Sequence, residues 1–180
     1  MKTIFTTLLL AITIVSFAQK KDIEKDTIKL DEVLVSATRA SKKDPFTKSK
    51  LSKKQLEKQN LGQDIPILLD ALPNIVTTTD TGIGVGYTGI RVRGSDATRV
   101  NVTINGIPYN DSESQGTYWV DLPDFASSVE SSQLQRGVGT STNGAGAFGA
   151  SLSLETEGLS DKASVELSTS YGSFDTFKKI

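Results

Sequence analysis

Apolar residues recur at helical spacing in one segment of the chain and alternate with polar residues in several others. The helical stripe, at i, i+3, i+4 and i+7, consists of Ile65, Leu68, Leu69 and Leu72. Asp64 stands at the N-cap position, Pro66 is tolerated in the first turn, and Pro73 ends the helix. A second short helix is predicted over residues 51–59, with Ser52 as its N-cap.

Five short segments have the apolar and β-branched content of strands, namely residues 75–79, 90–93, 100–104, 129–135 and 151–156. Asn105-Gly106 follows the third of them and predicts a hairpin turn, because both positions tolerate a positive φ. Pro108 keeps the returning arm short. Short helices mixed with short strands predict an α+β domain.

Residues 163–171 alternate most regularly. One face consists of Ala163, Val165, Leu167, Thr169 and Tyr171, and the other is polar. A dyad repeat that ends in an aromatic residue is typical of a strand in a membrane β-barrel. The face of a soluble sheet also alternates, so this segment by itself leaves both interpretations open.

The N-terminus predicts an export signal over residues 1–18. Lys2 gives a basic start, the apolar core runs over residues 8–15, and the small residues Ser16 and Ala18 precede the expected cleavage site. A membrane anchor is the alternative, but it needs roughly 20 apolar residues. This core is too short for one, so we expect the mature protein to be exported.

A polar tether is predicted over residues 19–50. Between residues 19 and 60 there are 12 Lys and Arg against 7 Asp and Glu. A basic segment can indicate nucleic-acid binding, but an exported protein seldom meets nucleic acid. One β-prone run, residues 30–35, interrupts the tether without apolar neighbours to pack against. We therefore expect this run to pair with a partner.

The amino-acid composition limits which metal sites and catalytic sites the chain can form. The chain has no cysteine and no histidine, which removes disulfides, thiolate metal sites, the commonest zinc ligand and the usual general base. We expect no cofactor, no resident metal and no catalytic residue, so an enzyme is the least favoured class.

Four motifs, in this order, resemble those of TonB-dependent outer-membrane receptors. They are a TonB box, DEVLVSAT, at residues 31–38; RVRG and RVNVTINGIP at 91–94 and 99–108; QLQRGVG and GAGAFG at 133–139 and 144–149; and YGSF at 171–174. GAGAFG also matches a dinucleotide-binding pattern, but a strand-like segment follows where that pattern requires a helix. Many boxes carry threonine where Glu32 stands.

The resemblance implies an α+β plug domain, a small mixed sheet with two short helices, preceding a transmembrane β-barrel of which this chain holds only the first strand region. The expected parts are a signal peptide at 1–18, a periplasmic tether at 19–50, the plug at 51–158 and the start of the barrel at 159–180. A barrel of about 22 strands needs several hundred residues after Ile180.

The implied function is TonB-dependent import of a scarce bulky solute across the outer membrane of a Gram-negative bacterium, first of all an iron–siderophore complex. The implied partners are TonB with its inner-membrane energising complex, the solute, and outer-membrane lipid around the barrel. The alternative is a secreted soluble β-rich binding module without transport activity. That alternative explains the export signal but not the isolated β-prone run.

Three sets of site residues follow from the resemblance. TonB would add as a strand to Asp31, Glu32, Val33, Leu34 and Val35, unless this run is an edge strand of the plug itself. Arg93 and Arg136 would pair with glutamates of the barrel wall, or else be solvated arginines at strand ends. The candidate solute contacts, on two loops that could instead be periplasmic turns, are Thr81, Tyr87, Tyr109, Asn110 and Gln115.

Overall fold

The computed structural model describes residues 39–41, 43–138, 146–160, 162–163, 165, 167–173 and 177–179. The predicted signal peptide and the box-like residues 31–38, which include all five proposed TonB-binding residues, lie outside these ranges. Within them the chain forms one strand, two helices, six strands and a closing hairpin, with short 3₁₀ turns in between.

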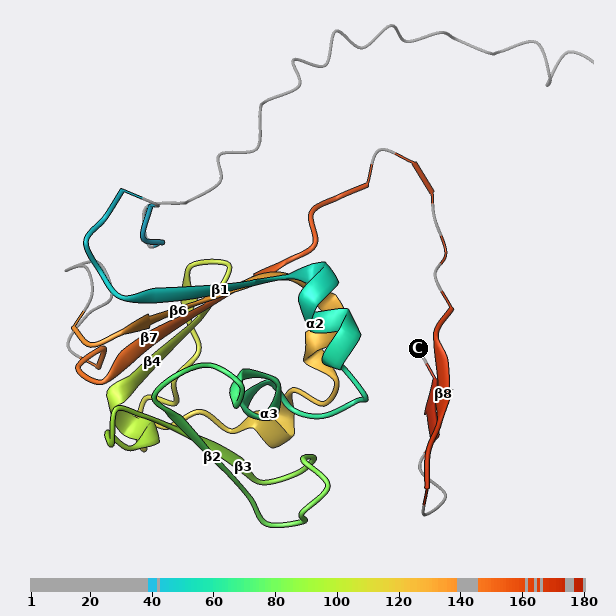
Figure 1. Ribbon diagram of the computed structural model, residues 1–180, viewed down its shortest axis with the longest axis horizontal. Coiled ribbons are helices and arrows are strands. Elements are labelled where there is room, and N and C mark those ends of the chain that lie inside the picture. The colour runs from blue at the N-terminus through green and yellow to red at the C-terminus, as the bar shows by residue number, and fades with distance from the viewer. Residues whose placement is uncertain are drawn as a thin grey trace, which may run out of the picture. The chain divides into compact units, whose positions relative to one another are not determined.

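Five strands form one mixed sheet in the order β1-β6-β7-β4-β5 (Figure 1). Their bounds are Lys48–Ser52 for β1, Val100–Ile104 for β4, Ile107–Pro108 for β5, Val129–Arg136 for β6 and Ala150–Thr156 for β7. All neighbours are antiparallel except β4 and β7. Asn105 and Gly106 both have a positive φ, so the hairpin turn predicted between β4 and β5 is confirmed.

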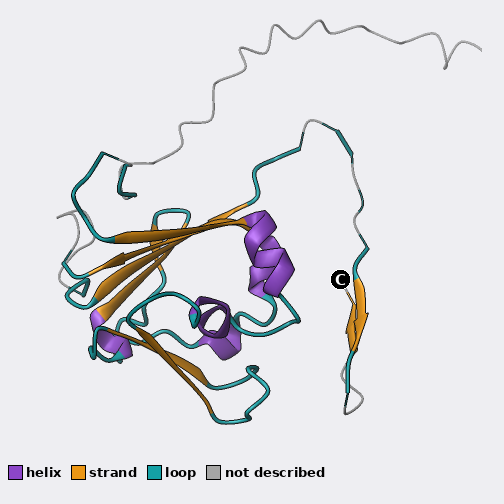
Figure 2. Ribbon diagram, in the orientation of Figure 1, coloured by secondary structure: helices purple, strands orange, loops and turns teal. Residues whose placement is uncertain are grey.

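Two helices and a second hairpin complete the domain (Figure 2). Helix α2 (Lys53–Gln59) follows β1 directly, with Ser52 at the N-cap position as predicted. Helix α3 (Ile65–Leu69) packs against β2 (Ile75–Thr79) and β3 (Thr88–Val92), which pair antiparallel with each other. It buries Ile65, Leu68 and Leu69 but ends before Pro73, so Leu72 of the predicted stripe follows the helix in a bend and is half-buried.

One apolar core joins the larger sheet to these helices and to β3. Its largest fully buried side chains include Trp119, Leu56, Ile65, Leu69, Leu134, Leu152 and Leu154. The last three come from β6 and β7, where alternate residues face opposite sides of the sheet. Burial of a leucine-sized side chain contributes about 1.5–3 kcal/mol, so this leucine face fixes how the two strands sit on the core.

Two segments differ from the sequence-based expectation. Residues 48–52 form the edge strand β1, whereas the tether was expected to extend to residue 50 and the plug to begin at 51 with a helix. The segment KSKLS has a single apolar residue, and its strand conformation depends on pairing with β6 rather than on its own pattern.

The strand expected over residues 163–171 is shorter. Among the described residues of this segment, strand conformation is confined to Thr169–Tyr171, β8, which pairs antiparallel with β9, Phe177–Lys179. The apolar–polar alternation extends to residues before Thr169 that have no strand partner within the described ranges. Periodicity alone therefore does not reveal where strand pairing begins. In the described part of the chain, no helix has both the length and the apolar character needed to cross a membrane.

Candidate functional site

The face of β6 and β7 opposite the core is polar. Ser131 and Gln133 of β6 lie opposite Glu155 and Ser153 of β7, and we call these four residues the polar face. Three of them are buried and Glu155 is partly exposed. Buried polar groups need hydrogen-bond partners. Within the face, Ser131 Oγ donates to Glu155 Oε2 at 3.0 Å, and further partners come from the N-terminal end of the described chain.

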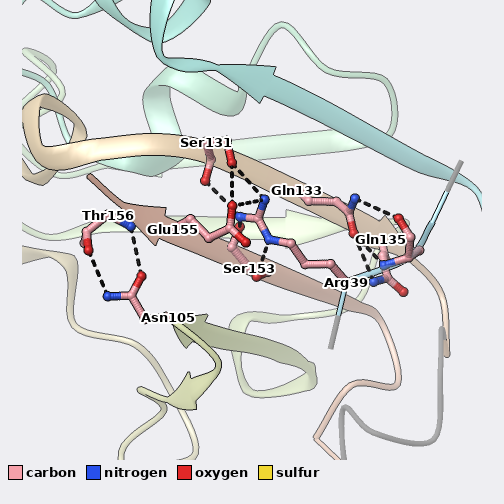
Figure 3. Close-up of polar contacts among 9 residues, drawn as sticks. Arg39, Asn105, Ser131, Gln133, Gln135, Ser153, Glu155 and Thr156 are labelled. Carbon is pink, nitrogen blue, oxygen red and sulfur yellow. Dashed lines mark hydrogen bonds and ion pairs between the residues drawn. The ribbon is translucent and has the colours of Figure 1, made fainter. Parts of the chain in front are cut away.

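Arg39 lies across the polar face (Figure 3). Its Nε donates to Ser153 Oγ at 3.0 Å, and its Nη1 donates to Ser131 Oγ at 2.8 Å. Nη2 donates to the carbonyl oxygens of Ser131 and Ser153 at 2.9 and 3.0 Å. Nη1 also forms an ion pair with Glu155 Oε2 at 2.8 Å. The planar guanidinium fork therefore joins two strands through a single side chain.

Ala40 adds two hydrogen bonds to the same face. Its backbone N donates to Gln133 Oε1 at 2.8 Å, and its carbonyl oxygen accepts from Gln133 Nε2 at 3.1 Å. We call Arg39–Ala40 the docked segment. Because it is held through both a side chain and the backbone, it is part of the folded domain although it precedes the first strand.

The ion pair of Arg39 is largely removed from solvent. The side chains of Arg39 and Glu155 are 10% and 30% exposed. Burial lowers the pKa of the Arg39 guanidinium, and the Glu155 carboxylate opposes this shift. Arginine stays protonated under physiological conditions, so loss of either partner would leave an uncompensated charge in a half-buried place.

Sequence reasoning did not single out Arg39 or Glu155. The alternation of SSQLQR and of SLSLET indicates that one face of each strand is polar. No local pattern says what covers that face, because Arg39 lies 92 and 114 residues away from its serine partners.

Arg93 and Arg136 lie close together. Arg136 Nη1 donates to Ser49 Oγ at 2.9 Å and to the Pro73 carbonyl at 3.3 Å. Arg93 Nη1 comes within 3.0 Å of the place that a Cβ on Gly137 would occupy. Burial lowers the pKa of Arg136, and the positive charge of Arg93 lowers it further.

Arg93 is exposed, whereas Arg136 is buried. Among the described residues no carboxylate forms an ion pair with Arg93 or Arg136, and Arg136 Nε is buried without a hydrogen-bond partner there. Pairing with barrel glutamates stays a prediction.

The glycine-rich loop between β2 and β3 is held by Asp64. The backbone N of Asp64 donates to the Gly84 carbonyl at 2.9 Å, and its carboxylate accepts from Thr88 Oγ1 at 2.8 Å. Asp64 is 1% exposed. Burial raises the pKa of this carboxyl group, although the Thr88 hydroxyl and the Gly86 N–H both act to lower it.

Two predicted solute contacts lie on this loop. Tyr87 is 65% exposed. Thr81 is exposed as well, and its Oγ1 donates to the Val85 carbonyl at 2.7 Å. A loop that is fixed at its base and exposes an aromatic and a hydroxyl group suits contact with a ligand, but contact with a solute stays a prediction for both residues.

The second predicted contact loop follows β5. Asn110 Oδ1 accepts from Val102 N at 2.7 Å, while its Nδ2 donates to the carbonyl oxygens of Val100 and Gln115 at 2.9 and 3.0 Å. Tyr109 packs against the core, whereas Gln115 is exposed with a φ of 58°. Asn110 thus serves the loop structure, and Gln115 is the more accessible candidate for a solute.

Residues 40–151 match the family model for the TonB-dependent receptor plug domain. The chain belongs to this family. The predicted fold class, a small mixed sheet with two short helices, is confirmed by the structure and by this match. The family is one of receptors and transporters rather than a class of enzymes. No curated protein matches the chain.

Solved receptor structures share parts of this fold. The copper transporter OprC matches with a TM-score of 0.53 and 17% identity, over 73% of this chain and 21% of its own. The siderophore receptor PirA of Acinetobacter baumannii has a TM-score of 0.49 and 23% identity, over 64% and 18%. The ferric yersiniabactin uptake receptor FyuA of Yersinia pestis has a TM-score of 0.45 and 16% identity, over 67% and 18%. The chain spans about a fifth of the length of these proteins. At 17% identity the likeness to OprC is one of fold alone.

Proposed function

We propose that this chain is the plug and energy-coupling part of a TonB-dependent importer in the outer membrane of a Gram-negative bacterium. The observation that carries the proposal is the plug-family match over residues 40–151. TonB and its inner-membrane energising complex are the proposed partners, and residues 31–35 are the proposed segment that TonB binds. The signal peptide over residues 1–18 and the barrel after residue 158 belong to the same proposal.

The position of the docked segment supports the proposal that residues 31–35 couple to TonB while the folded domain acts as the plug. The box-like motif ends at Thr38, and Arg39 follows it directly. A pull on the box therefore reaches the folded domain first at Arg39 and then at β1, which is an edge strand paired with β6 in the described sheet. Removal of an edge strand leaves the other strand pairings in place, so the plug is remodelled most easily from this end.

For the solute we propose a metal chelate, first of all an iron–siderophore complex. The chain has no histidine and no cysteine, so it lacks the imidazole and thiolate ligands that bind most transition metals. A chelate brings its own donor atoms and needs only aromatic, hydroxyl and amide contacts, such as Tyr87, Thr81 and Gln115. A copper transporter has a similar fold, so the fold does not indicate which metal the chelate carries.

A proline substitution in the box tests the coupling role. Val33→Pro removes a backbone donor and fixes φ, so a strand added to TonB loses one or more hydrogen bonds. A loss of about 1.4 kcal/mol lowers affinity tenfold. Energised uptake by the whole receptor should therefore fall by about tenfold or more, while binding of the solute to outer-membrane vesicles should persist.

Thr27→Pro, in the tether outside the box, is the control and should leave uptake unchanged. Uptake at the wild-type rate in Val33→Pro would remove the box assignment. Recovery of the mature protein in the medium rather than in the outer-membrane fraction would support the secreted binding module instead.

A further inference from the structure

We propose that Asn105 is a positioning residue that holds Glu155 in place and, through Glu155, the docked segment. The turn between β4 and β5 and the N-terminal end of the plug are then energetically coupled. The meaning of this coupling for transport rests on the proposed function, but the coupling itself can be measured without a solute.

Asn105 binds both neighbours of Glu155 on β7, Leu154 and Thr156, and Figure 3 shows its contacts with Thr156. Its backbone N donates to the Leu154 carbonyl at 2.8 Å. Its Nδ2 donates to Thr156 Oγ1 at 2.8 Å, and its Oδ1 accepts from Thr156 N at 2.9 Å. The carboxylate that pairs with Arg39 therefore stands on a stretch of backbone that Asn105 holds from both sides.

The end of β7 depends on these contacts because its pairing with β4 stops there and its pairing with β6 is interrupted. The parallel pairing of β4 with β7 ends at Ile104 and Leu154. The pairing of β6 with β7 shifts register between Val129 and Ser131, opposite the last two residues of β7. A bulge of this kind interrupts the ladder locally. Loss of the Asn105 side chain should therefore let Glu155 move away from the guanidinium.

Asn105 is equally part of the loop on the other side. Asn105 and Gly106 form the turn, with φ of 51° and 80°. Beyond the two residues of β5, Tyr109 N donates to the Val102 carbonyl at 2.8 Å, and Asn110 binds the same strand. A displacement of this loop acts on the turn and thus on β7. Coupling between two sites is reciprocal, so release of the docked segment also changes the loop.

The test is a double-mutant cycle on the whole receptor in outer-membrane vesicles. Ser36→Cys places a thiol just before Arg39, in a stretch of 180 residues that contains no other cysteine. Its rate of reaction with a maleimide, above that of the receptor without Ser36→Cys, reports how accessible the chain before Arg39 is. Asn105→Gly accepts the positive φ and removes the two side-chain bonds. Arg39→Gln removes the ion pair. Asn74→Gly is the matched control, since Asn74 also has a positive φ, of 64°.

Asn105→Gly should raise the labelling rate about twofold or more, and Arg39→Gln should raise it further. In the Arg39→Gln background Asn105→Gly should add nothing, because Glu155 then has no guanidinium to hold. A purely structural role would give the same effect in both backgrounds. Asn105→Asp tolerates the turn and keeps both contacts, because its carboxylate accepts from the Thr156 N–H and from the Thr156 hydroxyl. It should therefore restore the wild-type rate, and Asn74→Gly should not change it.

If the receptor with Asn105→Gly does not assemble, Thr156→Val replaces it in the cycle. Thr156→Val removes the hydrogen bond between Asn105 Nδ2 and Thr156 Oγ1 and should give the same pattern of labelling rates. Equal effects of the substitution in both backgrounds, or no effect in the wild-type background, would overturn the proposal. Binding of the purified C-terminal domain of TonB to the wild-type receptor is measured separately. Its absence would remove the proposed function while the labelling cycle still decides the coupling.

Discussion

Three charged side chains of the plug lie in surroundings that disfavour their charge, and each is compensated differently. Arg39 has Glu155 as an ion-pair partner. Asp64 has the Thr88 hydroxyl and a backbone N–H. Arg136 has only neutral oxygens and a second arginine beside it among the described residues. Of the three, Arg136 is the least compensated, and this is the residue-level reason to expect an acidic partner from the barrel.

The charge of Asp64 should make the glycine-rich loop sensitive to pH. Its pKa is raised in the folded domain, so the folded state holds the proton more tightly than the unfolded chain does. Its contribution to stability therefore increases as the pH falls through the raised pKa and is lost at higher pH. In the receptor, exchange of the amides at residues 84–88, corrected for intrinsic rates, should slow between neutral pH and about pH 4.

Asp64→Asn should flatten this profile, because the amide does not titrate. Asp70→Asn, which changes an exposed carboxylate just after the same helix, is the control and should keep the wild-type slope. Loop protection that decreases towards acid in the wild type would contradict the assigned sign.

At the level of elements, the start of β7 fixes how it pairs with β4. Gly149 N donates to the Arg99 carbonyl at 2.8 Å, and its own carbonyl accepts from Gly137 N at 2.7 Å. A Cβ on Gly149 would lie 2.6 Å from Ser95 Cβ and 3.0 Å from the Arg99 oxygen. Glycine is therefore required by close approach of the backbones, immediately before Ala150 pairs with Val100.

Gly149→Ala should separate these segments and destabilise the β4–β7 pairing by about 1–3 kcal/mol, as overpacking does. The measurement is hydrogen exchange of β4 and β7 amides in the receptor, which should become faster. Gly146→Ala, three residues earlier, should leave exchange unchanged, because no atom of the described residues lies within 4 Å of its added Cβ. Similar exchange in the two variants would mean that the turn relaxes freely.

For the whole molecule, the fold class was predictable because its strongest signals are local or are motifs in a fixed order. The stripe of α3 and the Asn105-Gly106 turn are read from neighbouring residues. The strand β1 and the contacts of Arg39 were not predictable, because each depends on residues far away in the chain. Asp64 was predicted as a helix cap, and it does occupy that position, but its carboxylate binds Thr88 instead of capping the helix.

At the scale of the assembled receptor, Arg93 and Arg136 test how the plug is held inside the barrel. Removal of one partner from a buried ion pair costs about 3–5 kcal/mol, since the other charge stays uncompensated. If both arginines pair with barrel glutamates, replacing both with alanine should loosen the plug. The barrel has its own closed hydrogen-bond network and should still insert. Cells that carry the double variant should therefore become more sensitive to large antibiotics that the outer membrane excludes.

Arg91→Ala, which replaces an exposed arginine on β3, is the matched control and should keep wild-type resistance. Wild-type resistance in the double variant as well would instead mean that solvent, not the barrel, compensates both charges.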